Sequence, residues 1–276
     1  MADDGQEAVL ERIADALERL SPPPIYPIDL DSEAAYYWDG TQFSAIPNFD
    51  PIPLDMLSGI DDQKARLLEN TDRQACGHAA HDVLLWGSRG MGKSALAKST
   101  VKSLQDDGAS IALIETGSDH LSSLPKLFQM LGKVQSRFIL FIDDISFEDD
   151  SATPRLLRSM LEGGASQRPA NVRLYITSNR RHIVSRSMAE QDDPVNPRDV
   201  VDDKLALSDR FGLRLGFHAA SQDDYLAMIK KYAATYELTY TQEDALLWSK
   251  QRGSRSGRVA WQYIVELAGR AGRTLT

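Results

Sequence analysis

The sequence has a single cysteine, no long apolar run and fewer basic than acidic residues. With Cys76 as the only cysteine among 276 residues, the chain cannot form an internal disulfide. The apolar run Phe138–Ile142 is far too short to cross a bilayer, which takes about 20 residues. Acidic residues Asp3, Asp4 and Glu7 stand where a secretory signal would carry positive charge. We therefore expect a cytoplasmic protein without membrane insertion.

Positive charge is in the minority, with 31 Lys and Arg against 40 Asp and Glu. Residues 1–80 hold 16 acids and 5 bases, whereas residues 81–276 are nearly balanced. Because affinity for a phosphate backbone comes mainly from Lys and Arg, such a chain is a poor non-specific nucleic-acid binder. One stretch, residues 250–273, has six bases and only the acid Glu266. We interpret it as a solvated helical face with one nucleotide-sensing arginine, in preference to a DNA-binding stripe.

The pattern of apolar residues changes twice along the chain and divides it into three segments. Residues 1–50 combine a predicted helix over 6–20 with a proline-interrupted arm that carries aromatic residues at Tyr36, Tyr37, Trp38 and Phe43. We expect this arm to pack on the main domain of the same chain or on another molecule. Residues 51–219 alternate short apolar runs with helical patterns and form the predicted α/β domain. Residues 220–276 show only helical patterns and form a predicted small helical domain.

Five apolar runs predict the strands of a parallel sheet covered on both faces. Helices are predicted between the first four, over 93–106, 121–133 and 153–162. Ligands of such sheets bind beyond the carboxyl ends of the strands. The predicted strands are Val83–Trp86, Ile111–Glu115, Phe138–Ile142, Val172–Thr177 and Leu213–Phe217.

A glycine-rich loop links the first strand to a helix and fits G-x-x-x-x-G-K-[ST], the phosphate-binding motif. Its glycines allow several N–H groups to point into one concavity at a helix N-terminus. Lys93 is expected to reach the β- and γ-phosphates of ATP, and the Ser94 hydroxyl to hold Mg²⁺. A glycine turn without a ligand is the alternative. The predicted nucleotide contacts are Gly87, Ser88, Arg89, Gly90, Met91, Gly92, Lys93, Ser94 and the following Ala95.

Polar side chains follow two other predicted strands. Asp143 and Asp144 end the run Phe138–Ile142. Asp143 is expected to hold Mg²⁺ through its water shell, and Asp144 to orient or deprotonate the attacking water. Asn179 follows the next strand and would touch the γ-phosphate if that strand lies between the other two. Taken alone, such acids also occur as helix caps, and such asparagines as turn residues.

The order of these motifs resembles the AAA+ ATPase family over roughly residues 50–272. Within that family, the pieces Trp86–Ser94 and Gln251–Trp261 are similar to stand-alone bacterial ATP-binding proteins grouped as a domain family of unknown function. The stretch Leu207–Gly216 is similar to that of branch-migration motors. The motifs in order are the Gly87–Ser94 loop, Asp143-Asp144, Thr177–Asn179, Ser208–Gly212 and Ser256–Ala260.

The resemblance implies a five-stranded parallel core with a C-terminal helical lid, and a nucleotide-dependent homo-oligomer. Arg210 would reach into a neighbouring subunit's site as an arginine finger, and its alternative is a surface arginine paired with Asp209 or a neighbour. Arg258 would sense the γ-phosphate from the lid, with Arg255 as the competing candidate. Ile60 occupies the place where the family holds adenine against an apolar residue.

One position departs from the family, which usually has Asp-Glu where this chain has Asp143-Asp144. The shorter carboxylate of Asp144 lies further from the attacking water, so hydrolysis is expected either to be slow or to recruit an extra water. Glu148 is the alternative base, although we interpret it in preference as a surface charge. The grouping of Cys76, His78 and His81 has no fourth ligand at a sensible spacing, so we do not interpret it as a zinc site.

Together, these patterns predict an ATPase that uses ATP hydrolysis to remodel an unidentified protein or nucleic-acid client. A slow conformational switch or adaptor, in which ATP orders the arm or the loop 180–204, is the alternative. A small-molecule P-loop kinase is a third hypothesis, but the Arg210–Gly212 stretch and the helical C-terminal part fit it poorly.

Overall fold

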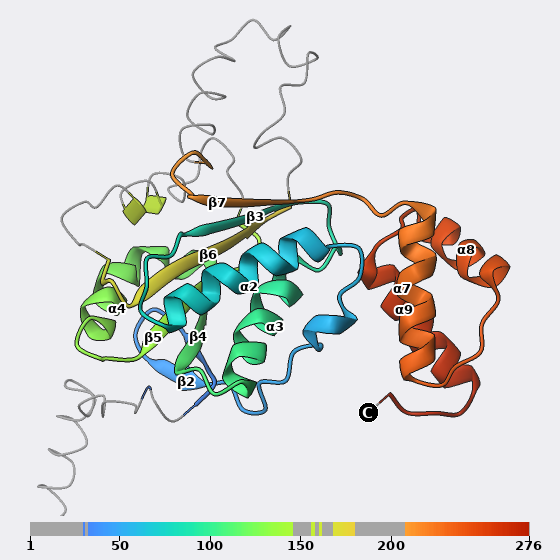
Figure 1. Cartoon of the computed structure of the whole chain (residues 1–276), viewed down its shortest axis with the longest axis horizontal. Coiled ribbons are helices and arrows are strands. Elements are labelled where there is room, and N and C mark those ends of the chain that lie inside the picture. The colour runs from blue at the N-terminus through green and yellow to red at the C-terminus, as the bar shows by residue number, and fades with distance from the viewer. Residues whose placement is uncertain are drawn as a thin grey trace, which may run out of the picture.

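A computed structural model describes residues 30, 33–145, 156–157, 160–161, 168–179 and 208–275. At its centre is a seven-stranded sheet of order β2-β1-β4-β5-β6-β3-β7 (Figure 1). Neighbouring strands are parallel except for the antiparallel pair β1 and β2. The strands are β1 (Ala35–Trp38), β2 (Phe43–Ala45), β3 (Val83–Gly87), β4 (Ile111–Thr116), β5 (Arg137–Ile142), β6 (Val172–Ser178) and β7 (Leu213–Phe217).

The five strands predicted from the sequence are all present, but the predicted five-stranded sheet is wrong by two strands. The additional strands come from the N-terminal arm, where β1 pairs in parallel with β4. Tyr36 and Trp38 are fully buried while Tyr37 between them is 37% exposed, as expected for alternating side chains on a strand. The Trp38 indole also donates to Ser123 Oγ at 2.7 Å. The described part of the arm therefore packs on the main domain of the same chain.

Helices cover both faces of the sheet. α2 (Asp61–Ala75) and α3 (Lys93–Asp106) lie on one face, and α4 (Leu124–Leu131) lies on the other (Figure 1). Leu85 and Leu113 pack toward α2 and α3, whereas Leu84 and Ile114 join the core on the α4 side. Side chains that alternate along a strand thus supply two cores.

The helices predicted over 121–133 and 153–162 correspond only in part to described helices. The helix predicted over 121–133 begins as a 3₁₀ turn, η2 (Ser118–Ser123), before α4. Of the helix predicted over 153–162, only residues 156–157 and 160–161 are described, and they are helical. The helix predicted over 6–20 lies outside the described residues.

Three helices follow the sheet, α7 (Gln222–Thr235), α8 (Gln242–Gln251) and α9 (Gly257–Arg270). Each begins after a capping residue, Ser221, Thr241 or Ser256, whose side-chain hydroxyl accepts a hydrogen bond from a backbone N–H in the first turn of the helix. Figure 1 shows them as a group beyond the end of β7. Most of their buried apolar residues belong to the same core as α2 and α3. A further 3₁₀ turn, η1 (Leu54–Met56), precedes α2.

Among the described helices, none is both long and apolar enough to cross a lipid bilayer.

Candidate nucleotide site

The loop between β3 and α3 requires glycine at both of its ends. Gly87 has a φ of 122°, and a Cβ placed on it would lie 2.1 Å from the Phe217 carbonyl oxygen. Ser88 N donates to that same oxygen at 2.7 Å, which fastens the loop to β7. Gly92 stands at the start of α3 with a φ of 86°, in the left-handed region. The loop therefore turns sharply and opens directly into a helix N-terminus.

The Lys93 ammonium group connects several groups at this edge of the sheet by hydrogen bonds. Lys93 is buried, and its Nζ donates to Gly87 O at 3.0 Å, to Ser88 O at 2.9 Å and to Asn179 Oδ1 at 2.8 Å. Burial lowers the pKa of Lys93 to about 8, while the carboxylates of Asp144 and Asp143 act in the opposite direction. A buried cation thus connects the loop after β3 to the end of β6.

Two predicted magnesium ligands meet at the ends of neighbouring elements. Ser94 Oγ donates to Asp143 Oδ1 at 2.6 Å, and Thr177 Oγ1 donates to the same carboxylate oxygen. A hydroxyl and a carboxylate are hard oxygen donors, and Mg²⁺ usually takes one or two such groups together with substrate phosphates. The residues present therefore fit this ion.

Asp144 and Asn179 are held together on neighbouring strands. β6 lies between β5 and β3, which is the arrangement that the role of Asn179 requires. The Asn179 amide donates to Asp144 Oδ1 and accepts from Lys93. Asp144 has a φ of 51°, uncommon for a residue other than glycine, and its N–H donates to Thr177 Oγ1 at 2.8 Å. The chain thus turns sharply after Asp143 so that both acids face the loop.

A cavity of about 310 Å³ brings most of the predicted residues together. Gly87 does not line it, and Ser88 and Arg89 line a second, larger cavity that meets the first at Asn179. Of the residues that the structure describes, neither cavity includes Arg210. The predicted residues that line the first cavity are Ile60, Gly90, Met91, Gly92, Lys93, Ser94, Ala95, Asp143, Asp144, Asn179 and Arg258.

One end of this cavity is apolar and comes largely from residues that the sequence did not single out. Trp261 of α9 packs edge-on against Tyr232 and Tyr236, with ring centroids 5.6 Å apart in each case. In the sequence, Tyr232, Tyr236 and Met228 fall within residues 220–276, for which only helical patterns were recognised. The apolar lining residues are Ile52, Leu57, Ile60, Met228, Tyr232 and Trp261.

The start of α9 touches the phosphate-binding loop directly. Arg258 N donates to Gly90 O at 3.1 Å, and a Cβ placed on Gly90 would lie 2.9 Å from Ser256 Oγ. The charge of Arg258 also lowers the pKa of Lys93, so the two cations are close. Arg255, the competing candidate, lines the second cavity.

Arg210 lies in the turn before β7 and is partly exposed. Its neighbour Asp209 pairs with Arg214 at 2.6 Å. Glu148 and the loop 180–204 lie outside the described residues.

Comparisons with known proteins agree with this architecture. The profile of the family described as "Protein of unknown function (DUF815)" matches residues 31–271. No curated protein matches at a significant level. The Thermotoga maritima RuvB Holliday junction branch migration motor is 20% identical, with a TM-score of 0.51 over 82% of this chain and 68% of that one. The Aeropyrum pernix ORC1 protein in complex with DNA is 17% identical, with a TM-score of 0.55 over 84% of this chain and 65% of that one. At these identities the likeness to the two structures shows a shared fold.

Proton uptake on ATP binding tests the environment of Lys93. With a pKa of about 8, this amine is roughly half protonated at pH 8 in the free protein. Phosphates beside it raise that pKa, because an opposite charge favours the charged form. We expect Mg²⁺·ATP binding to take up about half a proton at pH 8 and far less at pH 6.5. Calorimetry in buffers of different ionisation enthalpy measures the uptake. Equal uptake at the two pH values would contradict the assignment.

Proposed function

We propose that this chain, which belongs to the DUF815 family and shares its fold with RuvB and ORC1, is an AAA+ P-loop ATPase that binds Mg²⁺·ATP and hydrolyses it. The observation that carries the proposal is the meeting of Lys93, Asp143 and Asn179 at three neighbouring strand ends. A buried lysine, a metal-binding carboxylate and a polar amide in that arrangement are suited to a polyphosphate and its metal ion.

The orientation of the nucleotide follows from the two ends of the 310 Å³ cavity. The apolar end suits adenine, which would lie against Ile60 and the aromatic ring of Trp261. The loop backbone and Lys93 would bind the phosphates at the other end. Arg258 would approach the γ-phosphate from α9, and residues 220–276 would act as a lid over the nucleotide-binding domain, residues 51–219.

The proposed mechanism assigns one role to each polar residue. Ser94 and Asp143 would hold Mg²⁺, and the ion, when bound, would supply positive charge that neutralises charge developing on the phosphate oxygens. Lys93 would supply a second positive charge. Asp144 accepts a proton from the attacking water, while Asn179 fixes the Asp144 carboxylate and the Lys93 ammonium relative to one another.

We further propose that the protein acts as a homo-oligomer that remodels a protein or nucleic-acid client. In this proposal Arg210 serves a neighbouring subunit as an arginine finger, because it lies in the turn before β7 and away from the cavity of its own chain. The alternative is a slow conformational switch. It is favoured by the short Asp144 side chain and by the bond between Arg258 N and Gly90 O, through which a change in the loop can move α9.

Substitutions of Asp144 test the hydrolytic step. Asp144→Asn should keep ATP affinity but slow hydrolysis by roughly 10²-fold or more, because the proton acceptor is lost. Asp144→Glu should keep or raise the rate, since it restores the length common in the family. Steady-state phosphate release and calorimetry measure the two properties. If both variants hydrolyse ATP like the parent, the base lies elsewhere and Glu148 is the next residue to replace.

A mixing experiment tests the finger. Arg210→Ala should keep ATP affinity and lose about 10³-fold or more in hydrolysis. Lys93→Ala should lose ATP binding but still carries Arg210, and Arg210→Ala still carries an intact phosphate-binding loop. A mixture of the two inactive variants should therefore recover part of the ATPase activity. A mixture that stays inactive while both proteins are folded would refute the trans role, as would full activity of the parent as a monomer.

A further inference from the structure

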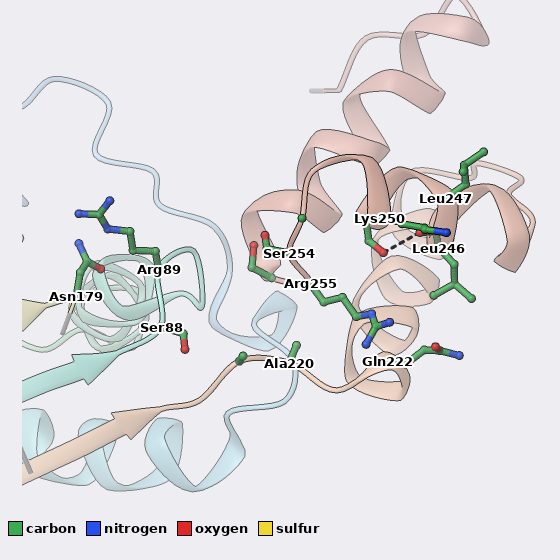
Figure 2. Close-up of a pocket in the computed structure, with 14 residues that line it drawn as sticks. Ser88, Arg89, Asn179, Ala220, Gln222, Leu246, Leu247, Lys250, Ser254 and Arg255 are labelled. Atoms are coloured by element: carbon green, nitrogen blue, oxygen red, sulfur yellow. Dashed lines mark hydrogen bonds between the residues drawn. The ribbon is translucent and has the colours of Figure 1, made fainter. Parts of the chain in front are cut away.

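The second cavity has a volume of about 1220 Å³ and lies between the phosphate-binding loop and the segment that joins α8 to α9. Figure 2 shows Arg89 and Asn179 together at the loop end, with Lys250 and Arg255 across the cavity on the helical side. No residue that lines it is acidic. Within the described parts of the chain, the exposed Arg89 guanidinium has no carboxylate partner. Arg89 therefore offers an exposed positive charge to this cavity.

Arg89 lies close to the position proposed for the terminal phosphate. Asn179 lines both cavities and accepts a hydrogen bond from Lys93, the residue expected between the β- and γ-phosphates. The charge of Arg89 also acts on Lys93 and, like that of Arg258, lowers its pKa. None of the residues at the apolar end of the first cavity lines the second cavity. Arg89 thus flanks the γ-phosphate end of the site from the side of the second cavity.

We propose that Arg89 contacts the γ-phosphate of ATP bound in its own chain and stabilises the charge that develops there during hydrolysis. This rests on the proposed ATPase function and adds a cation supplied in cis. An arginine suits the role because its planar guanidinium can donate two parallel hydrogen bonds to phosphate oxygens. Hydrolysis would then have a component that does not depend on a neighbouring subunit.

The step in which Arg89 acts is attack of water on the γ-phosphorus. A bond forms from the water oxygen to phosphorus as the bond to the bridging oxygen breaks, and the electron pair of that bond stays on ADP. The water proton passes to Asp144 and then to solvent. Arg89 donates hydrogen bonds to the equatorial oxygens throughout and exchanges no proton, since arginine stays protonated.

Arg89→Ala tests the proposal against Lys250→Ala, which removes a cation from the far side of the same cavity. We expect Arg89→Ala to bind Mg²⁺·ADP within about twofold of the parent, as the loop backbone is unchanged. Its affinity for Mg²⁺·ADP with aluminium fluoride, a mimic of the transferring phosphoryl group, should fall by roughly 10²-fold, with a similar loss in the rate of hydrolysis. Arg89→Lys should recover part of both, and Lys250→Ala should match the parent.

The dependence on protein concentration separates Arg89 from Arg210. The fractional loss of activity in Arg89→Ala should be the same at low and high protein concentration, because the residue acts within one chain. The proposal is overturned if Arg89→Ala binds Mg²⁺·ADP with aluminium fluoride as tightly as the parent does. It is also overturned if the variant loses the same factor in affinity for Mg²⁺·ADP alone, because such a loss indicates a structural role in the loop. If the parent itself binds no ATP, the proposed function fails first; if the parent hydrolyses ATP and Arg89→Ala keeps its rate, only the role of Arg89 fails.

Discussion

The buried ammonium group of Lys93 is the interaction on which the candidate site depends. Its three hydrogen bonds tie the loop after β3 to Asn179 at the end of β6, and Asn179 in turn holds Asp144 after β5. Desolvation of a lysine is costly, which is why its pKa falls to about 8 in the free protein. The fold tolerates this cost at the edge where β3, β5 and β6 present polar groups together. A polyphosphate placed there would relieve it.

Much of this edge could be predicted because each part is local in sequence. An apolar run followed by Gly87–Ser94, or by Asp143 and Asp144, indicates both the strand and the chemistry at its end. The order of the strands then brings the parts together, as it does for Asn179 on β6. The sequence did not predict β1 and β2, since four and three residues between prolines carry too weak a pattern, and their stability comes from burial of Tyr36 and Trp38.

The parts that the sequence missed depend on contacts between distant segments. Trp261 and Met228 lie on helices whose apolar spacing indicates only a buried face, and they line the cavity because α7 and α9 pack beside the loop. The contact between Arg258 N and Gly90 O is a backbone bond, to which side-chain identity gives no clue. Arg89 fits the phosphate-binding motif as an unspecified position, and only the structure shows it lining the second cavity.

The central claim is that the loop and Lys93 form a nucleotide site, and direct titration with a slowly hydrolysed ATP analogue tests it most simply. Calorimetry of the parent with Mg²⁺ present should give saturable binding of one nucleotide per chain. A folded Lys93→Ala variant should give no measurable binding, because the charge facing the β- and γ-phosphates is gone. Equal binding by both proteins, or none by the parent, would contradict the account.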